Sequence, residues 1–335
     1  MSRLDFSVSD LLNTSVHFPG EPTATGLDFF ADGHFTEAYE TLGFYSSADF
    51  IELGRFFGVV EDGVREQIAL FAERRAAVEQ MLAKSALSDE ARARYLFRFR
   101  YTESIFRRKL EEAAKFYWRT RKNQASRQKK RGKVDAGTRG QVTGGRHLDG
   151  FARLVEDICL KAGFGKDEIF FNRAVPVPGY YRPQRNWDVV VLRDGKLIAA
   201  IELKSQSGSF GNNFNNRSEE VLGVSRDFWM AYRERVFGVT EAPWLGYLFF
   251  LEDSPMSDHA VALAESPLPP LAVFNDTSYL RRYEILCERL MLERDYTATA
   301  LLVSDKATAS VRDGGESVGA LRFFSSLYAH LTVKS

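Results

Sequence analysis

Residues 186–206 have the sequence NWDVVVLRDGKLIAAIELKSQ, and this stretch says most about the fold. Two apolar runs flank Asp194-Gly195, a dipeptide typical of tight β-hairpin turns. Both runs are apolar at successive positions rather than at alternate ones, as in a strand pair at the centre of a sheet. The stretch therefore predicts a central hairpin that other elements cover on both faces.

Three charged residues lie near the open end of this hairpin. Asp188 begins the first strand, and Glu202 and Lys204 lie near the end of the second. Glu202 and Lys204 share a face, because residues two apart in a strand point the same way. Charges in so apolar a setting are costly to desolvate unless they have a use. The two carboxylates and the backbone carbonyl of Leu203 would form a hard-oxygen site suited to Mg²⁺.

This set of groups is the minimum for metal-assisted hydrolysis of a phosphodiester. A bound Mg²⁺ would lower the pKa of a water ligand and neutralise charge on the phosphate. Lys204 would orient the water, help to deprotonate it, or contact a phosphate oxygen. An exposed Glu–Lys pair at a strand edge is the alternative explanation, but the apolar hairpin and Gln206 on the same face favour the site.

The register of the hairpin decides whether the two carboxylates can share a metal ion. An unbroken ladder from a two-residue turn would put Asp188 opposite Ile201 and turn Glu202 to the other face. We therefore predict either a β-bulge in the hairpin or a three-residue loop with Gly195 in the left-handed conformation.

Around the hairpin, the apolar pattern predicts an α/β domain with a mixed sheet. Helices are expected over residues 147–164, 216–237, 278–293 and 318–332, and strands over residues 169–171, 187–204, 244–251 and 297–304. A loop is expected over residues 254–270. Upstream, helices are predicted over residues 63–84 and 88–117, the second with Ser88 as its N-cap.

The composition is that of a globular protein: 44% of the 335 residues are hydrophobic and 27% are charged. This length suggests about two domains. The two cysteines form no disulfide framework, and there is neither a membrane-length apolar run nor an N-terminal signal core, so a cytoplasmic protein is expected. No zinc site is expected, because four of the histidines lack ligand spacing: His34, His147, His259 and His330.

Positive charge is concentrated in one segment, although the chain has 45 Lys and Arg residues and 45 Asp and Glu residues in total. Residues 115–146 contain eleven Lys and Arg residues and a single acid, Asp135. Such a segment pairs well with a polyphosphate backbone. A solvated, flexible linker is the alternative, and the segment alone does not decide between the two.

Residues 187–234, WDVVVLRDGKLIAAIELKSQSGSFGNNFNNRSEEVLGVSRDFWMAYRE, closely resemble the XhoI-type family of type II restriction endonucleases. The upstream segments KFYWRTRKNQ and DAGTRGQVTGGRHLDGF resemble the N-terminal part of the same family. The likeness covers about two thirds of the chain, from residue 110 to the end. Its most specific feature is the long Ser/Gly/Asn block that follows residue 206.

The resemblance implies a PD-(D/E)xK nuclease fold in residues 109–335, preceded by a mostly helical extension over residues 1–108. The extension has balanced charges and is expected to brace the core or to contribute to a dimer, with a longer recognition site as the alternative. The implied activity is that of a Mg²⁺-dependent homodimer that cuts double-stranded DNA at CTCGAG, or at a longer site containing it, and leaves 5′ overhangs. A cognate DNA methyltransferase would protect the host.

The same resemblance assigns the catalytic positions. Asp188, Glu202 and Lys204 take the three signature positions, and Trp187 stands where the motif has Pro. Glu156 is a candidate for an additional acid, with a solvent-exposed Glu as the alternative. A structure-specific or repair nuclease of the same fold, and a DNA-binding module without cleavage, are the alternative functions.

The Ser/Gly/Asn block leaves the strand that carries Lys204, so we predict a loop near the scissile phosphate. Asn suits adenine and Arg suits guanine, although a turn cluster that needs left-handed backbone is the alternative. With the basic segment and, secondarily, the residues before the catalytic strand, the predicted DNA contacts are Lys129, Lys130, Arg131, Tyr180, Tyr181, Arg182, Arg185, Gln206, Ser207, Asn212, Asn213, Asn215, Asn216 and Arg217.

Overall fold

The computed structural model describes residues 87–100, 103–130, 146–172 and 174–334, together with residues 80, 83 and 84. The chain divides into two units, Met1–Lys109 and Leu110–Ser335. In the first unit the described elements are α6 (Asp89–Arg100) and the start of α7 (Glu103–Lys130). The helix predicted over residues 63–84, and most of the predicted helical extension, lie outside the described residues.

Helix α6 begins where the sequence predicts. The hydroxyl of Ser88 accepts a hydrogen bond from the backbone N–H of Ala91 at 3.3 Å, so the predicted N-cap is confirmed. The prediction of one helix over residues 88–117 is wrong, because α6 ends at Arg100 and α7 begins at Glu103. Within the first unit, Phe97 of α6 and Phe106 of α7 pack edge to face.

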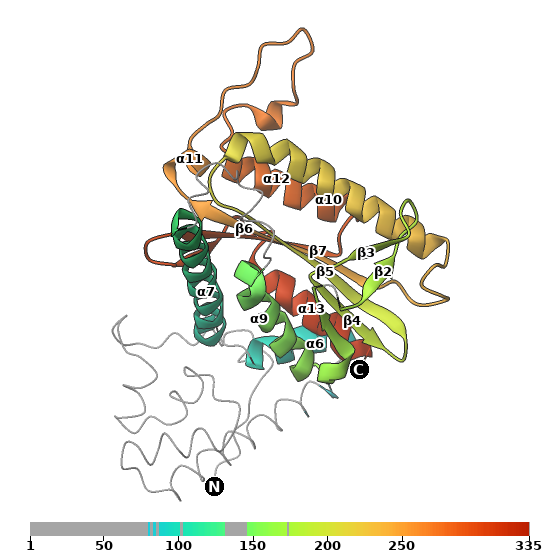
Figure 1. Ribbon diagram of the computed structural model, residues 1–335. Helices are drawn as coiled ribbons and strands as arrows, with labels where there is room; N and C mark the ends of the chain where they lie inside the picture. Colours follow the sequence, from blue (N-terminus) through green and yellow to red (C-terminus); the bar gives the residue numbers. More distant parts are fainter. Residues whose placement is uncertain are drawn as a thin grey trace, which may run out of the picture. The chain divides into compact units, whose positions relative to one another are not determined.

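A six-stranded mixed sheet forms the centre of the second unit (Figure 1). Strands β5, β6 and β7 are parallel, and the other neighbours are antiparallel. The predicted α/β class with a mixed sheet is confirmed. In sheet order the strands are β1 (Ile169–Phe171), β4 (Val189–Arg193), β5 (Lys196–Gln206), β6 (Trp244–Asp253), β7 (Ala298–Asp305) and β8 (Val311–Asp313).

Three strands were not predicted, and each has only three residues, too few to show a period of two. One is β8, at the edge of the main sheet. The other two form a separate hairpin, β2 (Pro176–Pro178) with β3 (Gln184–Asn186), immediately before the central strands.

The central hairpin contains the predicted β-bulge. Its two-residue turn has positive φ at both positions, 51° at Asp194 and 72° at Gly195, which suits the twist of the flanking strands. The pairing then slips by one residue, leaving Ile198 as the extra residue of β5. Continuing this register brings Asp188 opposite Glu202. The alternative prediction, a three-residue loop, is wrong.

Helices cover both faces of the sheet (Figure 1). One face carries α10 (Phe210–Arg233) and α12 (Tyr279–Leu292), and the other carries α9 (Asp149–Lys161), α13 (Ala320–Lys334) and the part of α7 that belongs to this unit. A 3-10 turn, Arg146–Leu148, precedes α9, and a short helix, α11 (Pro255–Asp258), follows β6. Among the described residues, no helix is long and apolar enough to cross a membrane.

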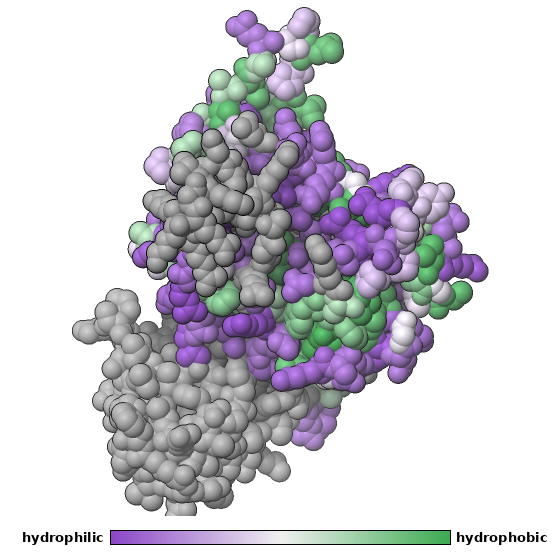
Figure 2. All heavy atoms as spheres, in the orientation of Figure 1, coloured by the Kyte–Doolittle hydropathy of each residue, from purple (hydrophilic) through white to green (hydrophobic). Residues whose placement is uncertain are grey.

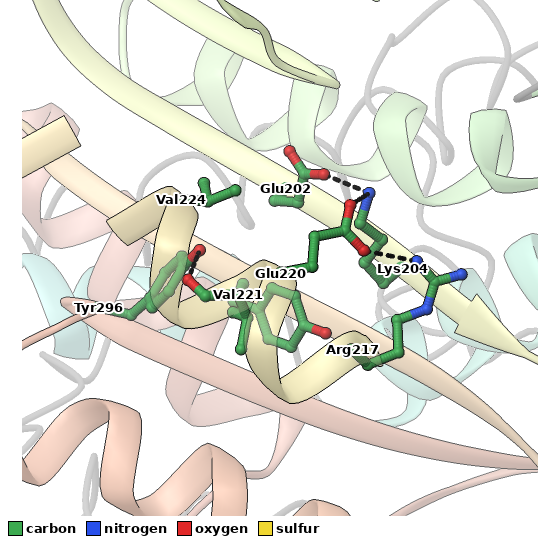
Figure 3. Close-up of a pocket in the computed structure, with 8 residues that line it drawn as sticks. Glu202, Lys204, Arg217, Glu220, Val221, Val224 and Tyr296 are labelled. Carbon is green, nitrogen blue, oxygen red and sulfur yellow. Dashed lines mark hydrogen bonds and ion pairs between the residues drawn. The ribbon is translucent and has the colours of Figure 1, made fainter. Parts of the chain in front are cut away.

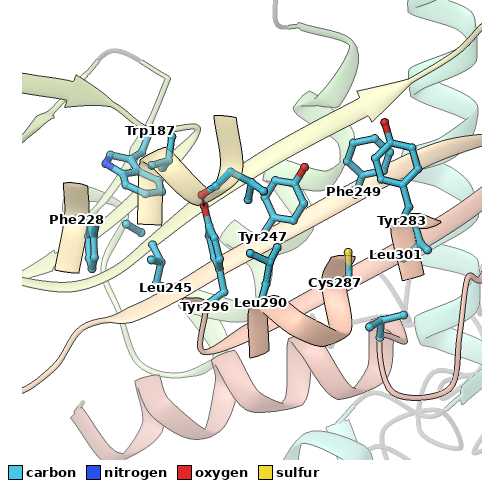
Figure 4. Packing of buried hydrophobic residues seen from close by; sticks show 14 of the residues in the cluster. Trp187, Phe228, Leu245, Tyr247, Phe249, Tyr283, Cys287, Leu290, Tyr296 and Leu301 are labelled. Carbon is cyan, nitrogen blue, oxygen red and sulfur yellow. Dashed lines mark hydrogen bonds between the residues drawn. The ribbon is translucent and has the colours of Figure 1, made fainter. Parts of the chain in front are cut away.

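Alternate residues of β6 point to opposite faces of the sheet, so that apolar side chains pack against the helices on both faces. Tyr247 and Phe249 point toward α10 and α12, where Phe249 stacks on Tyr283 at a centroid distance of 4.2 Å (Figure 4). Phe250 points the other way and packs on Tyr117 of α7. A strand that is buried on both faces must be apolar throughout, as β6 is.

Helix α10 begins six residues earlier than predicted. The sequence favours a start at residue 216 because Gly and Asn have low helix propensity. In the structure α10 begins at Phe210, whose side chain is buried, and Phe214 packs edge to face on Tyr283. Burial of these aromatic rings outweighs the propensity of the residues between them. The predicted loop over residues 207–217 is therefore mostly helix.

The loop between α11 and α12 projects from the second unit (Figure 1). The sequence predicts a loop over residues 254–270, of which Pro255–Asp258 form α11 instead, and a 3-10 turn, Ala272–Phe274, lies farther along the same connection. Several of its apolar side chains are exposed: Leu263, Leu268, Leu271 and Val273. Hydrophobic residues, in green, lie among hydrophilic ones on this projecting part of the molecule in Figure 2.

Candidate active site

Strand β5 and helix α10 place charged side chains together above the apolar core. Glu202 and Lys204 point from β5 toward α10, on the face that they share with Tyr247 and Phe249 of the neighbouring strand. Helix α10 contributes Glu220 and Arg217, and these two side chains line one small pocket together with Glu202 and Lys204 (Figure 3).

The charges in this pocket alternate in sign. Lys204 Nζ forms an ion pair with Glu202 and lies 3.1 Å from Glu220 Oε1. Arg185 Nη2 donates to Glu202 Oε1 at 2.9 Å, and Arg217 Nη1 lies 2.7 Å from Glu220 Oε2. Each carboxylate therefore faces two cations, which offsets much of the cost of removing it from water.

Lys204 is held in its charged form. Burial lowers the pKa of its ammonium, but the negative charges of Glu202 and Glu220 outweigh burial, so the pKa is raised above its usual value. A protonated ammonium can donate hydrogen bonds but cannot accept a proton. Of the roles predicted for Lys204, the structure therefore favours orientation and charge stabilisation over deprotonation of the water.

Asp188 has the opposite electrostatic environment. Its Oδ2 accepts a hydrogen bond from the backbone N–H of Leu203 at 2.7 Å, and it has no ion pair among the described residues. Burial, and then the charge of Glu202, raise the pKa of its carboxyl to about 7. Asp188 thus lacks the cation partners that Glu202 has, and a positive ion beside it would favour its charged form.

This donor set fits a hard divalent cation. Asp188 and Glu202 lie opposite each other, and the carbonyl of Leu203 belongs to the same strand segment. Oxygen ligands of this kind, completed by water, are those that Mg²⁺ prefers. In the part of the chain that the structure describes, no three His, Cys, Asp or Glu side chains gather as a metal-binding group.

The predicted additional acid does not join this pair. Glu156 lies on α9, which packs against the face of the sheet opposite to α10. The sequence predicts that Glu156 lies on a helix before the sheet, but it does not show which face of the sheet that helix covers.

Of the four arginines predicted to contact DNA, three are engaged in ion pairs. Arg185 binds Glu202, Arg217 binds Glu220, and Arg182 Nε lies 3.0 Å from Asp227 Oδ2. Their contacts with DNA stay predictions. The acidic partners of Arg182 and Arg185 lie on other elements or far along the chain, whereas Glu220 lies one helical turn from Arg217.

Gln206, for which a DNA contact is predicted, is buried in this structure. It is 4% exposed, and its Nε2 donates to the backbone carbonyls of Gly208 and Ser209 at 3.3 and 3.2 Å. Its Oε1 accepts the hydroxyl hydrogen of Tyr283. Gln206 therefore holds the turn between β5 and α10 instead of facing solvent.

The remaining predicted DNA contacts have various positions. Asn213 donates to the carbonyl of Ser209 at 2.9 Å, Asn215 and Asn216 are exposed on α10, and Ser207 is half-buried in the turn before it. The side chain of Asn212 and that of Arg131 lie outside the described residues. Lys129 and Lys130 end α7, and their side chains are likewise outside the description.

The β2–β3 hairpin is anchored to α10 by an acid that the sequence analysis missed. Asp227 is 3% exposed, and its Oδ1 accepts the backbone N–H groups of Tyr180 and Tyr181 at 2.9 and 2.7 Å. The two tyrosine rings are exposed, at 47% and 63%. An acid within the apolar stripe of a predicted helix was a signal for such an anchor, as was Gly179, where a Cβ atom would meet Asp227.

His147 lies on the opposite face of β5 from the charged pocket. Its Nε2 is 3.3 Å from Ser205 Oγ, and burial, followed by the charge of Arg121, lowers the pKa of the imidazole to about 4. His147 is therefore a neutral core residue that packs edge to face on Tyr117.

Comparison with known proteins adds to this geometry. A family model described as "Restriction endonuclease XhoI" matches residues 127–315, a range that includes every residue of the charged pocket. No solved structure matches the chain.

Three curated proteins are similar to this chain. The type II restriction enzyme BstVI of Geobacillus stearothermophilus is 42% identical over 204 residues, which cover 59% of this chain and 91% of that protein. The type II restriction enzyme XhoI of Xanthomonas vasicola is 44% identical over 47% of this chain and 64% of its own length. The type II restriction enzyme AbrI of Azospirillum brasilense is 43% identical over 46% of this chain and 69% of its own.

Proposed function

The chain belongs to the XhoI restriction endonuclease family, and from this membership we propose that it is a type II site-specific deoxyribonuclease. The observation that carries the proposal is the charged pocket of β5 and α10 within the matched region. A half-buried lysine, Lys204, lies between the carboxylates of Glu202 and Glu220, and Asp188 lies opposite Glu202; such an arrangement suits phosphodiester hydrolysis. The mixed sheet with helices on both faces is compatible with the PD-(D/E)xK fold, which we include in the proposal.

Asp188, Glu202 and the carbonyl of Leu203 would hold Mg²⁺, which when bound supplies an acidified water and offsets charge on the phosphate. Lys204 has three N–H donors and a fixed positive charge beside these acids. It would hold the attacking water or a non-bridging phosphate oxygen in line for reaction. Arg185 would keep its hydrogen bond to Glu202 and so offset part of the negative charge of that carboxylate.

We further propose a palindromic target, CTCGAG or a longer site containing it, cut by a homodimer to leave 5′ overhangs. The support is the resemblance of the Ser/Gly/Asn block and the names of the relatives. A palindrome read by a two-fold dimer presents one copy of each contact to each half-site. Such an activity requires a methyltransferase that protects the same site in the host.

The DNA-facing surface of the proposal has two parts. The first is the basic end of α7, where Lys129 and Lys130 suit phosphate contacts. The second is the β2–β3 hairpin, where Asp227 accepts the backbone N–H groups of Tyr180 and Tyr181 and both tyrosine side chains are exposed. Tyrosine side chains offer a large contact area at a low cost in conformational entropy.

Digestion of a fully sequenced, unmethylated plasmid tests the proposal. We expect discrete bands with Mg²⁺, no cleavage with EDTA, and run-off sequencing that places every end at CTCGAG. Cuts at only those CTCGAG sites that share flanking bases would mean a longer target. Nicking or trimming at junctions would replace the proposal with a repair nuclease, and retardation of DNA without cleavage would replace it with a binding module.

A further inference from the structure

Helix α10 brings a third carboxylate to the site, one that the catalytic hairpin does not contain. Glu220 lies on the third turn of α10, and its two oxygens face different cations. Oε1 lies 3.1 Å from Lys204 Nζ, and Oε2 lies 2.7 Å from Arg217 Nη1 (Figure 3). The Glu220 side chain is about one third exposed, whereas its neighbour Glu219 is exposed.

The ammonium of Lys204 needs such a partner to be fixed in position. Glu202 is two residues earlier on the same strand, so its approach to Lys204 follows from strand geometry alone. A lysine side chain has several rotatable bonds and loses much rotamer freedom when it is held. Glu220 approaches from a second element, α10, which is anchored in the core by the buried Val221 and Val224 that line the same pocket.

We propose that Glu220 is a positioning residue, which fixes the Lys204 ammonium beside Glu202 and is itself fixed by Arg217. The inference rests on the proposed function, in which Lys204 acts on the water or the phosphate. Glu220 contacts neither the substrate nor the metal ion in this scheme, because both of its oxygens face cations of the protein. Arg217 accordingly supports Glu220, rather than a base.

Glu220→Gln tests the inference, with Glu219→Gln as the matched control. Both substitutions remove one negative charge at adjacent positions of α10, but only Glu220 contacts Lys204. Under single-turnover conditions at saturating enzyme, we expect E220Q to slow cleavage by roughly 10- to 100-fold, the effect of a misplaced catalytic group. We expect E219Q to stay within about twofold of wild type, the usual effect of an exposed substitution.

Two further measurements separate positioning from other roles. The Mg²⁺ concentration at half-maximal rate, and the dissociation constant for DNA in Ca²⁺, are expected to be unchanged in E220Q. In a Lys204→Ala background, E220Q is expected to cause no further loss, because the group that it positions is gone. If E220Q does not fold, Arg217→Gln replaces it, with a smaller loss of rate and the same unchanged Mg²⁺ dependence.

Several results would overturn the inference. Wild-type cleavage by E220Q would show that Lys204 needs no second partner. A large rise in the Mg²⁺ concentration that E220Q needs would mean that Glu220 is a metal ligand instead. An equal loss of rate in E219Q would mean that the effect comes only from the change in net charge. Failure of the proposed function is distinct, because in that case the wild-type protein would not cut DNA at a specific sequence.

Discussion

The two faces of β5 use the same strand for different purposes. Toward α10 the strand presents Glu202, Lys204 and Gln206, of which the first two are charged. Toward α7 and α9 the intervening residues are Leu203 and Ser205, and the groups beside Ser205, the His147 imidazole and the Tyr117 hydroxyl, are neutral. The two sets of side chains alternate along a few residues of one backbone, yet only one set carries charge.

The difference shows what a buried charge requires. On the α10 face Glu202, Lys204 and Glu220 each have an ion-pair partner from another element, whereas Asp188, which has no ion pair among the described residues, has a raised pKa instead. On the other face the polar groups satisfy one another as neutral hydrogen-bonding partners, with Ser205 beside His147. The charged face therefore carries a cost that only chemistry would justify, whereas the neutral face contributes stability.

The largest expected effect comes from Asp188→Asn, which removes the carboxylate of the charged face that has no ion-pair partner among the described residues. Cleavage should fall by about 1,000-fold or more, because a metal-binding carboxylate is lost. Stability should change in the opposite direction. The folded-state pKa of about 7 lies above the usual 3.8 of the unfolded chain, so ionisation at pH 8 destabilises the folded protein.

The Asn variant has no such ionisation. It should be more stable than wild type by about 4 kcal/mol at pH 8, and the difference should shrink as the pH falls from 7 to about 4. Chemical denaturation across this pH range, without metal, measures the effect. A variant less stable than wild type at pH 8 would show that Asp188 carries no electrostatic cost.

A second test sharpens the comparison through pH. Protons and Mg²⁺ compete for the Asp188 carboxylate, whose pKa is raised to about 7 by burial and then by Glu202. Below pH 7 the Mg²⁺ concentration for half-maximal cleavage should rise by about tenfold per pH unit, and above pH 8 it should level off. Titration of the single-turnover rate with Mg²⁺ at several pH values measures this. A constant requirement between pH 6 and 8 would exclude Asp188 as the titrating ligand.

A smaller effect is expected from Tyr283→Phe, which removes a neutral hydrogen bond from the charged face. The Tyr283 hydroxyl donates to Gln206, which holds the turn leading into α10. Loss of the bond should cost about 1 kcal/mol and slow cleavage only a few-fold, because no charge is left without a partner. Thermal melting and cleavage rates measure the two effects, and a loss as large as that of Asp188→Asn would contradict the comparison.

The smallest effect on activity is expected from Ser205→Ala on the neutral face. The Ser205 hydroxyl bonds the buried hydroxyl of Tyr117 and lies 3.3 Å from His147. Its removal should lower the free energy of unfolding by about 1–2 kcal/mol, because buried polar groups lose a partner. Denaturant melts measure this loss, and an unchanged stability would show that the neutral face contributes nothing.

Part of this arrangement follows from the sequence. The limits of β1, the central hairpin and the α/β class were predicted, and so was the β-bulge. The bulge could be predicted because Asp188 and Glu202 can meet on one face only if the register shifts. In this instance a chemical requirement predicted a backbone irregularity.

The rest could not be predicted, because it depends on contacts between distant segments. The early start of α10 results from burial of Phe210, against the local propensity of its Gly and Asn neighbours. The partners of Arg182 and Arg185 lie 45 and 17 residues away, and the contact of Glu220 with Lys204 joins a helix to a strand. Helix spacing does show Arg217 one turn from Glu220, but nothing in the sequence shows which residue the pair faces.

The most direct test compares adjacent residues of β5 that point to opposite faces. Lys204→Ala and Ser205→Ala would be assayed for single-turnover cleavage of a plasmid containing CTCGAG, after melting curves establish that both fold. We predict that Lys204→Ala slows cleavage by about 1,000-fold or more and that Ser205→Ala stays within about threefold of wild type. Wild-type cleavage by Lys204→Ala, or an equal loss in both folded variants, would contradict the assignment of the α10 face as the catalytic one.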